Sequence, residues 1–314
     1  MAPSRKKPVV IVTRKLPDAI ETRMMELFDA RLSLDDRKWT ASELATAMAS
    51  ADVLVPTVTD RIDAALINQS GPQLKLIASF GTGVDHIDLT AAHRRGIIVT
   101  NTPDVLTDAT ADLTMALILA ATRRLGEGER MVRRGAWKGW AFDQLLGMEL
   151  RGKQLGIVGY GRIGRAVAAR AQAFGMSIAH TSKSDAGMPL DRLLSTSDVV
   201  SLHVPLTDDT RHMIGQPELA RMKRSAYLVN TTRGPVVDEG ALAWALKNHL
   251  IAGAALDVYE REPTVHPDLV TMENVVLAPH LGSATTDTRT AMADLAARNV
   301  LAVLSGNAPL TPVT

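Results

Sequence analysis

Short apolar runs alternate with helical patterns along almost the whole chain, and this alternation restricts its fold more than any other feature. The apolar runs that read as strands are Val9–Val12, Val53–Val55, Leu76–Ser79, Ile97–Thr100, Leu155–Val158, Ser177–His180, Val199–His203, Tyr227–Asn230, Ala254–Asp257 and Val275–Ala278. Strands that alternate with helices in this way build βαβ units and parallel sheets. The sequence therefore predicts an α/β fold with doubly wound parallel sheets.

The strand runs fall into two groups, which predict two domains. The helical patterns are Ala19–Phe28, Ser42–Ala49, Ala64–Gln69, Leu89–Arg95, Ala109–Arg124, Ile163–Phe174 and Thr286–Leu304. The last of these, with a short tail, is too small for a domain, so we expect it to pack on the N-terminal one. We predict one domain from residues 1–100 with 283–314, and a dinucleotide-binding domain from residues 101–282 with six strands.

Composition excludes several classes of protein. The formal net charge of the 314 residues is +1, which argues against a general attraction to nucleic acid or membranes. The chain has no cysteine, which excludes disulfides and thiolate metal ligands, and no His/Asp spacing suggests a metal site. The most apolar helix pattern, Leu113–Thr122, is too short to span a bilayer. We expect a cytoplasmic protein without a metal.

A glycine motif opens the second group of strands. The motif is Gly159-Tyr160-Gly161-Arg162-Ile163-Gly164, between a predicted strand and a predicted helix. The first glycine permits a tight turn, the second lets the backbone approach a pyrophosphate, and the third lets helix and strand pack closely. The positive end of the helix attracts the anion. This context predicts a dinucleotide site.

The end of the next predicted strand favours NADP over NAD. NAD sites usually carry an acid there that binds the ribose 2′-hydroxyl. This chain has Ser182 near that position and Lys183 beside it, so a 2′-phosphate would meet a cation and no carboxylate. Asp185 lies slightly too late in the sequence for the ribose acid, although a shifted loop would restore NAD binding.

Three polar residues follow separate strands of the second group and suggest catalysis. They are Arg233, Glu262 and His280. Carboxyl ends of parallel strands are where such sheets bind ligands. A guanidinium suits the carboxylate of a keto acid, an imidazole suits proton donation to its carbonyl oxygen, and a carboxylate beside the imidazole favours the charged form.

Other histidines compete for the role of proton donor. They are His86, His203 and His212. His203 ends a predicted strand before Val-Pro, where it either lines the cofactor groove or is structural. Each residue of the trio alone could be an ordinary loop residue. Their occurrence together with the glycine motif makes the catalytic interpretation the better one.

In its motifs, the chain resembles the D-isomer-specific 2-hydroxyacid dehydrogenases. The resemblance covers nearly the whole chain, and its motifs are the glycine motif, His203-Val-Pro-Leu-Thr, Asn230-Thr-Thr-Arg-Gly, Asp257-Val-Tyr-Glu-Arg-Glu-Pro, Ala278-Pro-His-Leu-Gly and Gly81-Thr-Gly-Val-Asp-His-Ile-Asp. It implies two Rossmann-like domains with an interdomain cleft, and Arg233, Glu262 and His280 as the catalytic trio.

The resemblance also implies binding residues. Backbone amides of Thr82 and Gly83 would bind the substrate carboxylate, together with Arg233. Asp257 would contact the nicotinamide carboxamide. Further cofactor contacts, besides the glycine motif, Ser182 and Lys183, are implied at His203, Pro205, Thr231, Thr232, His280 and Gly282.

Assembly and activity are implied in the same way. Homodimers are usual in the family, with the long helix after residue 101 and the segment after it at the interface. Trp137 or Trp140 either reaches the partner's pocket or packs in that interface. The Ser-Lys pair is similar to the Asn-Arg-Ser pattern of NADPH-preferring glyoxylate and hydroxypyruvate reductases, with lysine for arginine. The implied reaction is hydride transfer from NADPH to a small 2-keto acid, giving a D-2-hydroxy acid. The alternatives are an NAD-dependent enzyme for another 2-hydroxy acid and a cofactor-sensing, corepressor-like binding protein.

Overall fold

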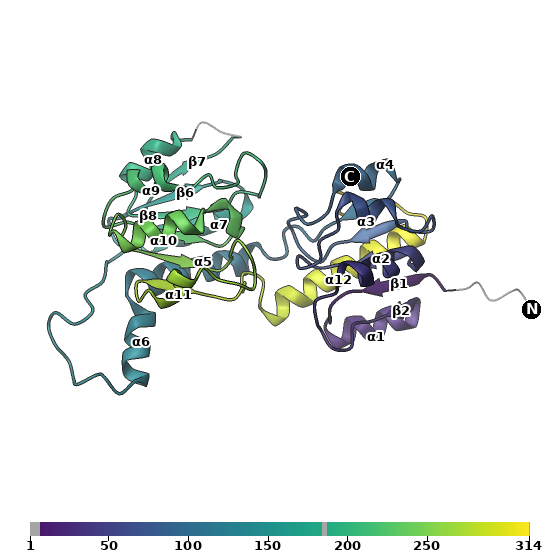
Figure 1. Cartoon of the computed structure of the whole chain (residues 1–314), viewed down its shortest axis with the longest axis horizontal. Helices are drawn as coiled ribbons and strands as arrows, with labels where there is room; N and C mark the ends of the chain where they lie inside the picture. Colours follow the sequence, from purple (N-terminus) through teal and green to yellow (C-terminus); the bar gives the residue numbers. More distant parts are fainter. Residues whose placement is uncertain (1–6, 184–186, 314) are drawn as a thin grey trace, which may run out of the picture. The chain divides into compact units, whose positions relative to one another are not determined.

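The computed structural model of the chain describes residues 7–183 and 187–313, so Asp185 lies outside the described residues. The chain forms two compact units (Figure 1), one of residues 1–106 with 285–314 and one of residues 107–284. The sequence placed the boundaries a few residues earlier. Each unit is a parallel sheet flanked by helices, which confirms the predicted fold class. Within the described residues, none of the helices combines the length and apolar character needed to cross a membrane.

The first unit has a five-stranded sheet with all its strands parallel. Its strand order is β2 (Asp29–Arg31), β1 (Val9–Val12), β3 (Val53–Val55), β4 (Leu76–Ala78) and β5 (Ile98–Thr100). The helices are α1 (Asp18–Leu27), α2 (Ala41–Ser50), α3 (Ala64–Asn68), α4 (Leu89–Arg94) and α12 (Thr286–Leu304). The sequence prediction missed β2, because this short edge strand is polar and carries no apolar run.

The two faces of this sheet have separate cores. On one face α12 contributes Ala293 and Val300 to a cluster that includes Val10 and Val12 of β1. On the other face α2, α3 and α4 pack against Ile11, Leu54 and Ile77. Sequence-distant ends of the chain therefore share one core.

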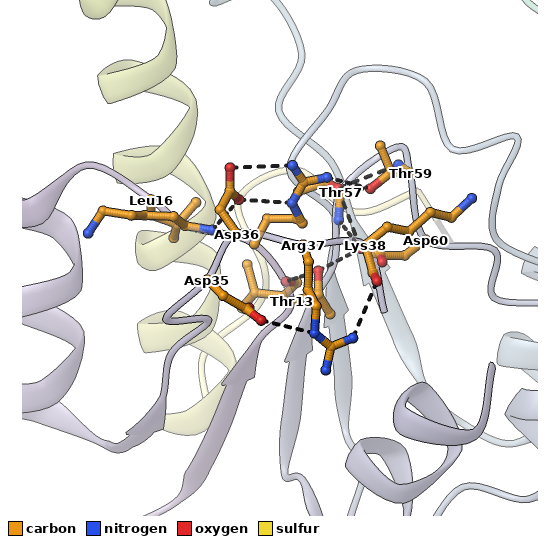
Figure 2. A network of polar contacts seen from close by, with 12 residues as sticks. Thr13, Leu16, Asp35, Asp36, Arg37, Lys38, Thr57, Thr59 and Asp60 are labelled. Carbon is orange, nitrogen blue, oxygen red and sulfur yellow. Dashed lines mark hydrogen bonds and ion pairs between the residues drawn. The ribbon is translucent and has the colours of Figure 1, made fainter. Parts of the chain in front are cut away.

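Polar contacts close the loops after β1 and β3 in the first unit (Figure 2). The Thr13 hydroxyl donates to Oδ2 of Asp60 at 2.5 Å, and the amide of Thr57 donates to the same oxygen at 2.9 Å. Arg14 forms an ion pair with Asp36 at 2.8 Å. Asp60 is buried, and its Oδ2 connects the loops after β1 and β3. The strand order of the sheet reverses between these two strands.

The second unit has a six-stranded parallel sheet, as predicted. The strand order is β11 (Val275–Leu277), β10 (Gly253–Leu256), β9 (Tyr227–Asn230), β8 (Val199–Leu202), β6 (Gln154–Val158) and β7 (Ser177–Thr181). Its helices are α5 (Thr107–Thr122), α6 (Leu125–Arg133), α7 (Arg162–Ala173), α8 (Leu190–Thr196), α9 (Gln216–Arg221), the short 3-10 turn η1 (Gly234–Val236), α10 (Glu239–Lys247) and α11 (Pro267–Thr271).

Helices cover both faces of this sheet (Figure 1). The core on one face joins α5 and α7 to the strands, and that on the other joins α8, α9 and α10. The strand order changes direction between β6 and β8, because β7 lies on one side of β6 and the later strands lie on the other. In doubly wound sheets the ligand crevice lies outside the carboxyl ends of the strands at this switch point.

The helix predicted over Ala109–Arg124 is α5, whereas α6, directly after it, was not predicted. α5 ends at Thr122, and Arg124 takes a left-handed conformation with φ of 53° before α6. α6 has no buried residue, and its first turn carries Gly126 and Gly128. Glycine disfavours a helix, so this glycine- and arginine-rich segment did not indicate one. Beyond it, the side chains of Trp140 and Phe142 are 84% and 82% exposed.

Candidate active site

The glycine motif forms the turn between β6 and α7. Gly159 has φ of +96°, and a β-carbon there would lie 2.5 Å from the carbonyl oxygen of His203. A β-carbon on Gly164 would lie 2.3 Å from the carbonyl oxygen of Gly159, whereas one on Gly161 would meet nothing within 4 Å. Two glycines are thus required by the fold itself, while the space over Gly161 is open. The first turn of α7 leaves backbone N–H groups without intrahelical partners there, which suits an anion such as a pyrophosphate.

The loop after β8 lies against this turn. The His203 amide donates to the carbonyl of Val158 at 2.7 Å, and its ring Nε2 is 2.8 Å from the Ser201 hydroxyl. Burial lowers the pKa of His203 to about 4, so the ring is neutral near pH 7. A neutral, hydrogen-bonded imidazole fits either open interpretation of this residue, the lining of a groove or a structural role. Pro205 is exposed, and its carbonyl accepts from Thr210 at 2.6 Å.

The turn after β9 is shaped by the side chain of Asn230. Its amide nitrogen donates to the carbonyl of Arg233 at 3.0 Å, and its oxygen accepts from the amide of Thr232 at 3.1 Å. The hydroxyl of Thr232 donates to the carbonyl of Val204. A β-carbon on Gly234 would lie 1.8 Å from the carbonyl carbon of Tyr259. The turn that carries Arg233 therefore packs directly on the backbone of the loop after β10.

Glu262 and His280 form a direct pair. The Nδ1 of His280 lies 2.9 Å from Oε2 of Glu262, and the other carboxylate oxygen, Oε1, accepts from the amide of Tyr259 at 3.1 Å. Their side chains are 34% and 33% exposed, respectively. His280 has φ of +56°, an uncommon conformation for a residue with a side chain. The pair is therefore partly open to solvent. The Glu262 carboxylate is held by His280 through one oxygen and by the Tyr259 amide through the other.

Asp257 fixes the loop that carries His280. Its carbonyl accepts from the amide of His280 at 2.8 Å. Its carboxylate accepts from the amides of Leu281 at 2.6 Å and Gly282 at 2.8 Å, and the side chain is fully buried. Burial raises the pKa of Asp257, although the two amides favour its charged form. Sequence reasoning missed this role, and the predicted contact with a nicotinamide carboxamide stays a prediction.

Charges around Glu262 favour its ionised form. Burial opposes ionisation, but the hydrogen bond to His280 and the charges of His280 and Arg233 outweigh it, so the pKa of Glu262 is lowered. Arg233 thus acts electrostatically on the same carboxylate that contacts His280. The structure brings the three predicted residues into one electrostatic group, although they come from three different strands.

Hydroxyl groups of α5 tie this group to the helix. The Thr110 hydroxyl donates to the carbonyl of Gly282 at 3.0 Å, and the hydroxyls of Thr114 and Thr231 lie 3.0 Å apart. Thr231 and Gly282 are buried. These contacts hold the two loops at the carboxyl edge of the sheet.

The end of β7 carries the residues that were expected to select the cofactor. Lys183 is exposed and forms an ion pair with Asp209, with Nζ 2.6 Å from Oδ2. Tyr160 stacks on His180 at a ring distance of 4.0 Å, and the Arg165 guanidinium lies over the Tyr160 ring. Ser182 follows β7 directly. The partner of Lys183 could not be found from the sequence, because Asp209 comes from the loop after another strand.

Thr82 and Gly83 belong to the first unit and follow β4. The Thr82 hydroxyl donates to the carbonyl of Thr102 at 3.0 Å, and the Asn101 side chain donates to the carbonyl of Thr82 at 2.8 Å. Both residues are partly exposed. Within residues 7–183 and 187–313, the backbone amides of these two residues donate no hydrogen bond. Two amides without a protein acceptor can bind an anionic oxygen.

No three His, Asp or Glu side chains in the described part of the chain are grouped so that they could hold a metal ion. The polar groups at the carboxyl edge of the second sheet are instead a cation, a carboxylate–imidazole pair and an open helix N-terminus. This set can bind an anionic substrate and move one proton.

Comparison with known proteins agrees with this chemistry. Residues 115–282 match the family model of the D-isomer specific 2-hydroxyacid dehydrogenase, NAD binding domain. The chain is 46% identical over 317 residues to a glyoxylate reductase of Thermococcus litoralis, with 96% of both sequences covered.

Two solved structures are similar over nearly the full length. One is an NADPH-dependent glyoxylate/hydroxypyruvate reductase from Sinorhizobium meliloti in complex with NADP and malonate, at 36% identity and a TM-score of 0.88, covering 98% of this chain and 97% of that one. The other is a glyoxylate reductase from Paecilomyes thermophila, at 32% identity and a TM-score of 0.89, covering 98% and 99%.

Proposed function

The chain belongs to the D-isomer specific 2-hydroxyacid dehydrogenases, and from this premise we propose that it is an NADPH-preferring reductase of glyoxylate, hydroxypyruvate or a similar small 2-keto acid. Members of this family are NAD(P)-dependent oxidoreductases that act on CH–OH groups, and the chain is such an enzyme. The observation that carries the finer proposal is the pair of His280 and Glu262 within the electrostatic reach of Arg233.

His280 is the proton donor in this proposal. Its Nδ1 contacts the Glu262 carboxylate, so Nε2 is the ring nitrogen that can give a proton to a substrate. When bound, the dihydronicotinamide would supply a hydride to the carbonyl carbon. Nε2 of His280 would give its proton to the carbonyl oxygen, and the product would be a 2-hydroxy acid. Glu262 orients the ring and stabilises the imidazolium until the proton leaves.

Arg233 holds the substrate in the same proposal. Its planar guanidinium can bind the carboxylate and the carbonyl oxygen of a 2-keto acid through two parallel hydrogen bonds. The amides of Thr82 and Gly83 supply further donors for the substrate carboxylate. We propose that the unit of residues 1–106 with 285–314 is a substrate-binding unit. We propose separately that the unit of residues 107–284 binds the coenzyme, contributes Arg233 to substrate binding and performs proton transfer.

The residues present fit a dinucleotide. The open space over Gly161, the N-terminus of α7 and the close packing at Gly159 and Gly164 suit a pyrophosphate. The proposed cofactor contacts are those named from the sequence, including Thr232, Pro205 and Asp257. Lys183 supports NADP, since its ammonium group can bind a 2′-phosphate. The relative from Sinorhizobium meliloti, described as NADPH-dependent, supports the same preference.

A panel of 2-keto acids, assayed with both coenzymes in the steady state, tests this function. We expect glyoxylate or hydroxypyruvate to be reduced with a higher kcat/KM for NADPH than for NADH. Faster turnover with NADH would contradict the coenzyme preference alone. A complete lack of turnover, together with capture of a stable protein partner, would favour a corepressor-like binding protein.

We also propose a homodimer in which α5, α6 and the segment after them contact the partner. Leu125 and Val132 of α6 are 63% and 60% exposed, and Trp140 and Phe142 are more exposed still. Such a run of exposed apolar side chains is typical of an interaction surface. A cavity of about 560 Å³ next to this region is lined by Ala121, Tyr227 and Met272 among others.

Light scattering tests the dimer, and a Trp140→Ser, Phe142→Ser variant is expected to scatter as a monomer. A wild-type monomer would contradict the proposal. If Trp140 reaches the partner's pocket, Trp140→Ala raises KM for the keto acid while the dimer persists. If it only packs in the interface, KM does not change. The cytoplasmic location expected from the sequence stays a prediction.

A further inference from the structure

Glu239, Glu260 and His212 form a second group of charged residues, and Glu260 belongs to the same loop as Glu262. The amide of Glu260 donates to Oε1 of Glu239 at 2.6 Å, and the amide of Glu239 donates to Oε1 of Glu260 at 3.3 Å. The Nε2 of His212 lies 2.8 Å from the same Glu260 oxygen. Each glutamate therefore binds the backbone of the other, and none of these residues has a part in the proposed chemistry.

Glu239 is the buried member of this group. It is 6% exposed and begins α10, so its backbone is fixed by the helix. Burial raises its pKa, while the backbone amides of Glu260 and His266 favour its charged form. The Glu239 carboxylate thus binds the amide of Glu260, two residues before Glu262 in the same loop.

The same group also reaches the turn that carries Arg233. The amide of His212 donates to the carbonyl of Pro235 at 2.7 Å, and its ring contacts Glu260. Gly234, next to Arg233, packs on the backbone of Tyr259 and Glu260. Movement of residue 260 would therefore change both the reach of Glu262 toward His280 and the packing of the Arg233 turn.

We propose that Glu239 is a positioning residue whose carboxylate holds the backbone amide of Glu260 and thereby sets the contact between Glu262 and His280. Glu239 touches no reacting atom and acts through the loop backbone. A buried amide that loses its acceptor is unfavourable, and the loop relaxes to satisfy it. Because small misplacements of catalytic groups are costly, this relaxation slows turnover. The inference rests on the proposed roles of Glu262 and His280.

Three substitutions of Glu239 test the inference. Glu239→Ala removes the acceptor, Glu239→Asp withdraws it by one methylene group, and Glu239→Gln keeps one acceptor oxygen. We expect kcat to fall about tenfold or more in the Ala variant and several-fold in the Asp variant, with a smaller change in KM for the keto acid. The Gln variant should recover most of kcat, because its amide oxygen can accept from Glu260.

Titration of the Glu262 carboxyl by NMR is the second readout. The pKa of Glu262 should rise in the Ala and Asp variants, because its contact with His280 weakens. This measurement needs no substrate, so it tests the positioning even if the wild-type protein reduces no keto acid, an outcome that would refute the proposed function alone. The titration also distinguishes a displaced Glu262 side chain from a general loss of stability. Circular dichroism measures the stability of each variant separately.

Glu218→Ala is the matched control. Glu218 lies in the first turn of α9 and accepts from the amide of Gly215 at 3.1 Å, so it is also a glutamate that binds a backbone amide near the start of a helix. It should lose stability without a change in kcat or in the Glu262 titration. A folded Glu239→Asp variant with wild-type kcat and wild-type Glu262 titration would overturn the inference. If Glu239→Ala does not fold, the Asp variant decides.

Discussion

The Nδ1 of His280 lies 2.9 Å from the Oε2 of Glu262, although 18 residues separate them in sequence. The pairing follows from the sheet, because Glu262 follows β10, His280 follows β11 and the two strands are hydrogen-bonded neighbours in register. Asp257 then holds the backbone of His280 and its two successors. The carboxylate–imidazole pair is therefore a product of strand order and loop anchoring.

Replacement of His280 by Gln should lower kcat for keto-acid reduction by about 10²–10⁴-fold, because the amide cannot supply the proton. Stopped-flow or steady-state assays at pH 7 with NADPH measure the effect. His93→Gln is the control, since His93 is exposed on α4 and should retain wild-type kcat. A His280→Gln variant with wild-type turnover would remove His280 from the mechanism.

Replacement of Glu262 by Gln should change the pH dependence of activity. The variant keeps a hydrogen-bonding group beside His280 but loses the negative charge that stabilises the imidazolium. Because the pKa of Glu262 is lowered and its carboxylate is charged at neutral pH, kcat/KM of the variant should be lower than that of the wild type at pH 7. The difference should shrink in acid, where the wild-type carboxyl takes up a proton. Superimposable pH profiles would show that the charge of Glu262 has no part in proton donation.

His203 should make the folded protein less stable in weak acid. Its pKa is lowered from 6.5 to about 4. Below pH 6.5 the unfolded chain binds a proton that the folded chain rejects until the pH approaches 4, so stability falls as the pH drops through this range. The effect is at most about 3 kcal/mol. His203→Gln should remove this part of the pH dependence.

Urea unfolding at pH 7, 5.5 and 4.5 measures the His203 effect. The difference in unfolding free energy between wild type and His203→Gln should change across these values. His93→Gln, which replaces an exposed histidine, should run parallel to the wild type. Parallel curves for both variants would contradict burial of a neutral His203.

Alanine at Gly161 should weaken coenzyme binding, whereas alanine at Gly164 should destabilise the fold. A β-carbon on Gly161 meets nothing within 4 Å, so Gly161→Ala should leave the melting temperature of the coenzyme-free protein nearly unchanged. Its methyl group would occupy the space for the pyrophosphate and weaken coenzyme binding by about tenfold or more. Calorimetric titration with NADPH measures the affinity.

Gly164→Ala is the contrasting variant, because its β-carbon would lie 2.3 Å from a backbone oxygen. It should lower the melting temperature before any coenzyme is added. If Gly161→Ala binds NADPH like the wild type, the pyrophosphate does not lie over this turn.

Lys183 should control the choice between coenzymes. Lys183→Ala should lower kcat/KM for NADPH by about tenfold and leave that for NADH nearly unchanged, since only NADPH has the 2′-phosphate. Asp209→Asn frees the lysine from its ion pair and should preserve or increase the preference for NADPH. An equal loss with both coenzymes in Lys183→Ala would contradict the assignment.

Much of the fold is predictable from local patterns. Buried strands such as Val9–Val12 and Val53–Val55 are continuous apolar runs because helices cover both faces of their sheets. β2 and α6 were missed for different physical reasons. β2 is a polar edge strand without an apolar run, and α6 begins with two glycines, which disfavour a helix.

The sequence by itself determined the parallel α/β architecture, the glycine turn and the kinds of residue that follow each strand. Only the tertiary structure decided which of these residues meet. Asp257 anchors the His280 loop, Lys183 pairs with Asp209, and Glu239 exchanges backbone contacts with Glu260. The reason is that hydrogen bonds between distant loops depend on strand order and register, which arise from packing of the whole sheet and leave no local pattern in the chain.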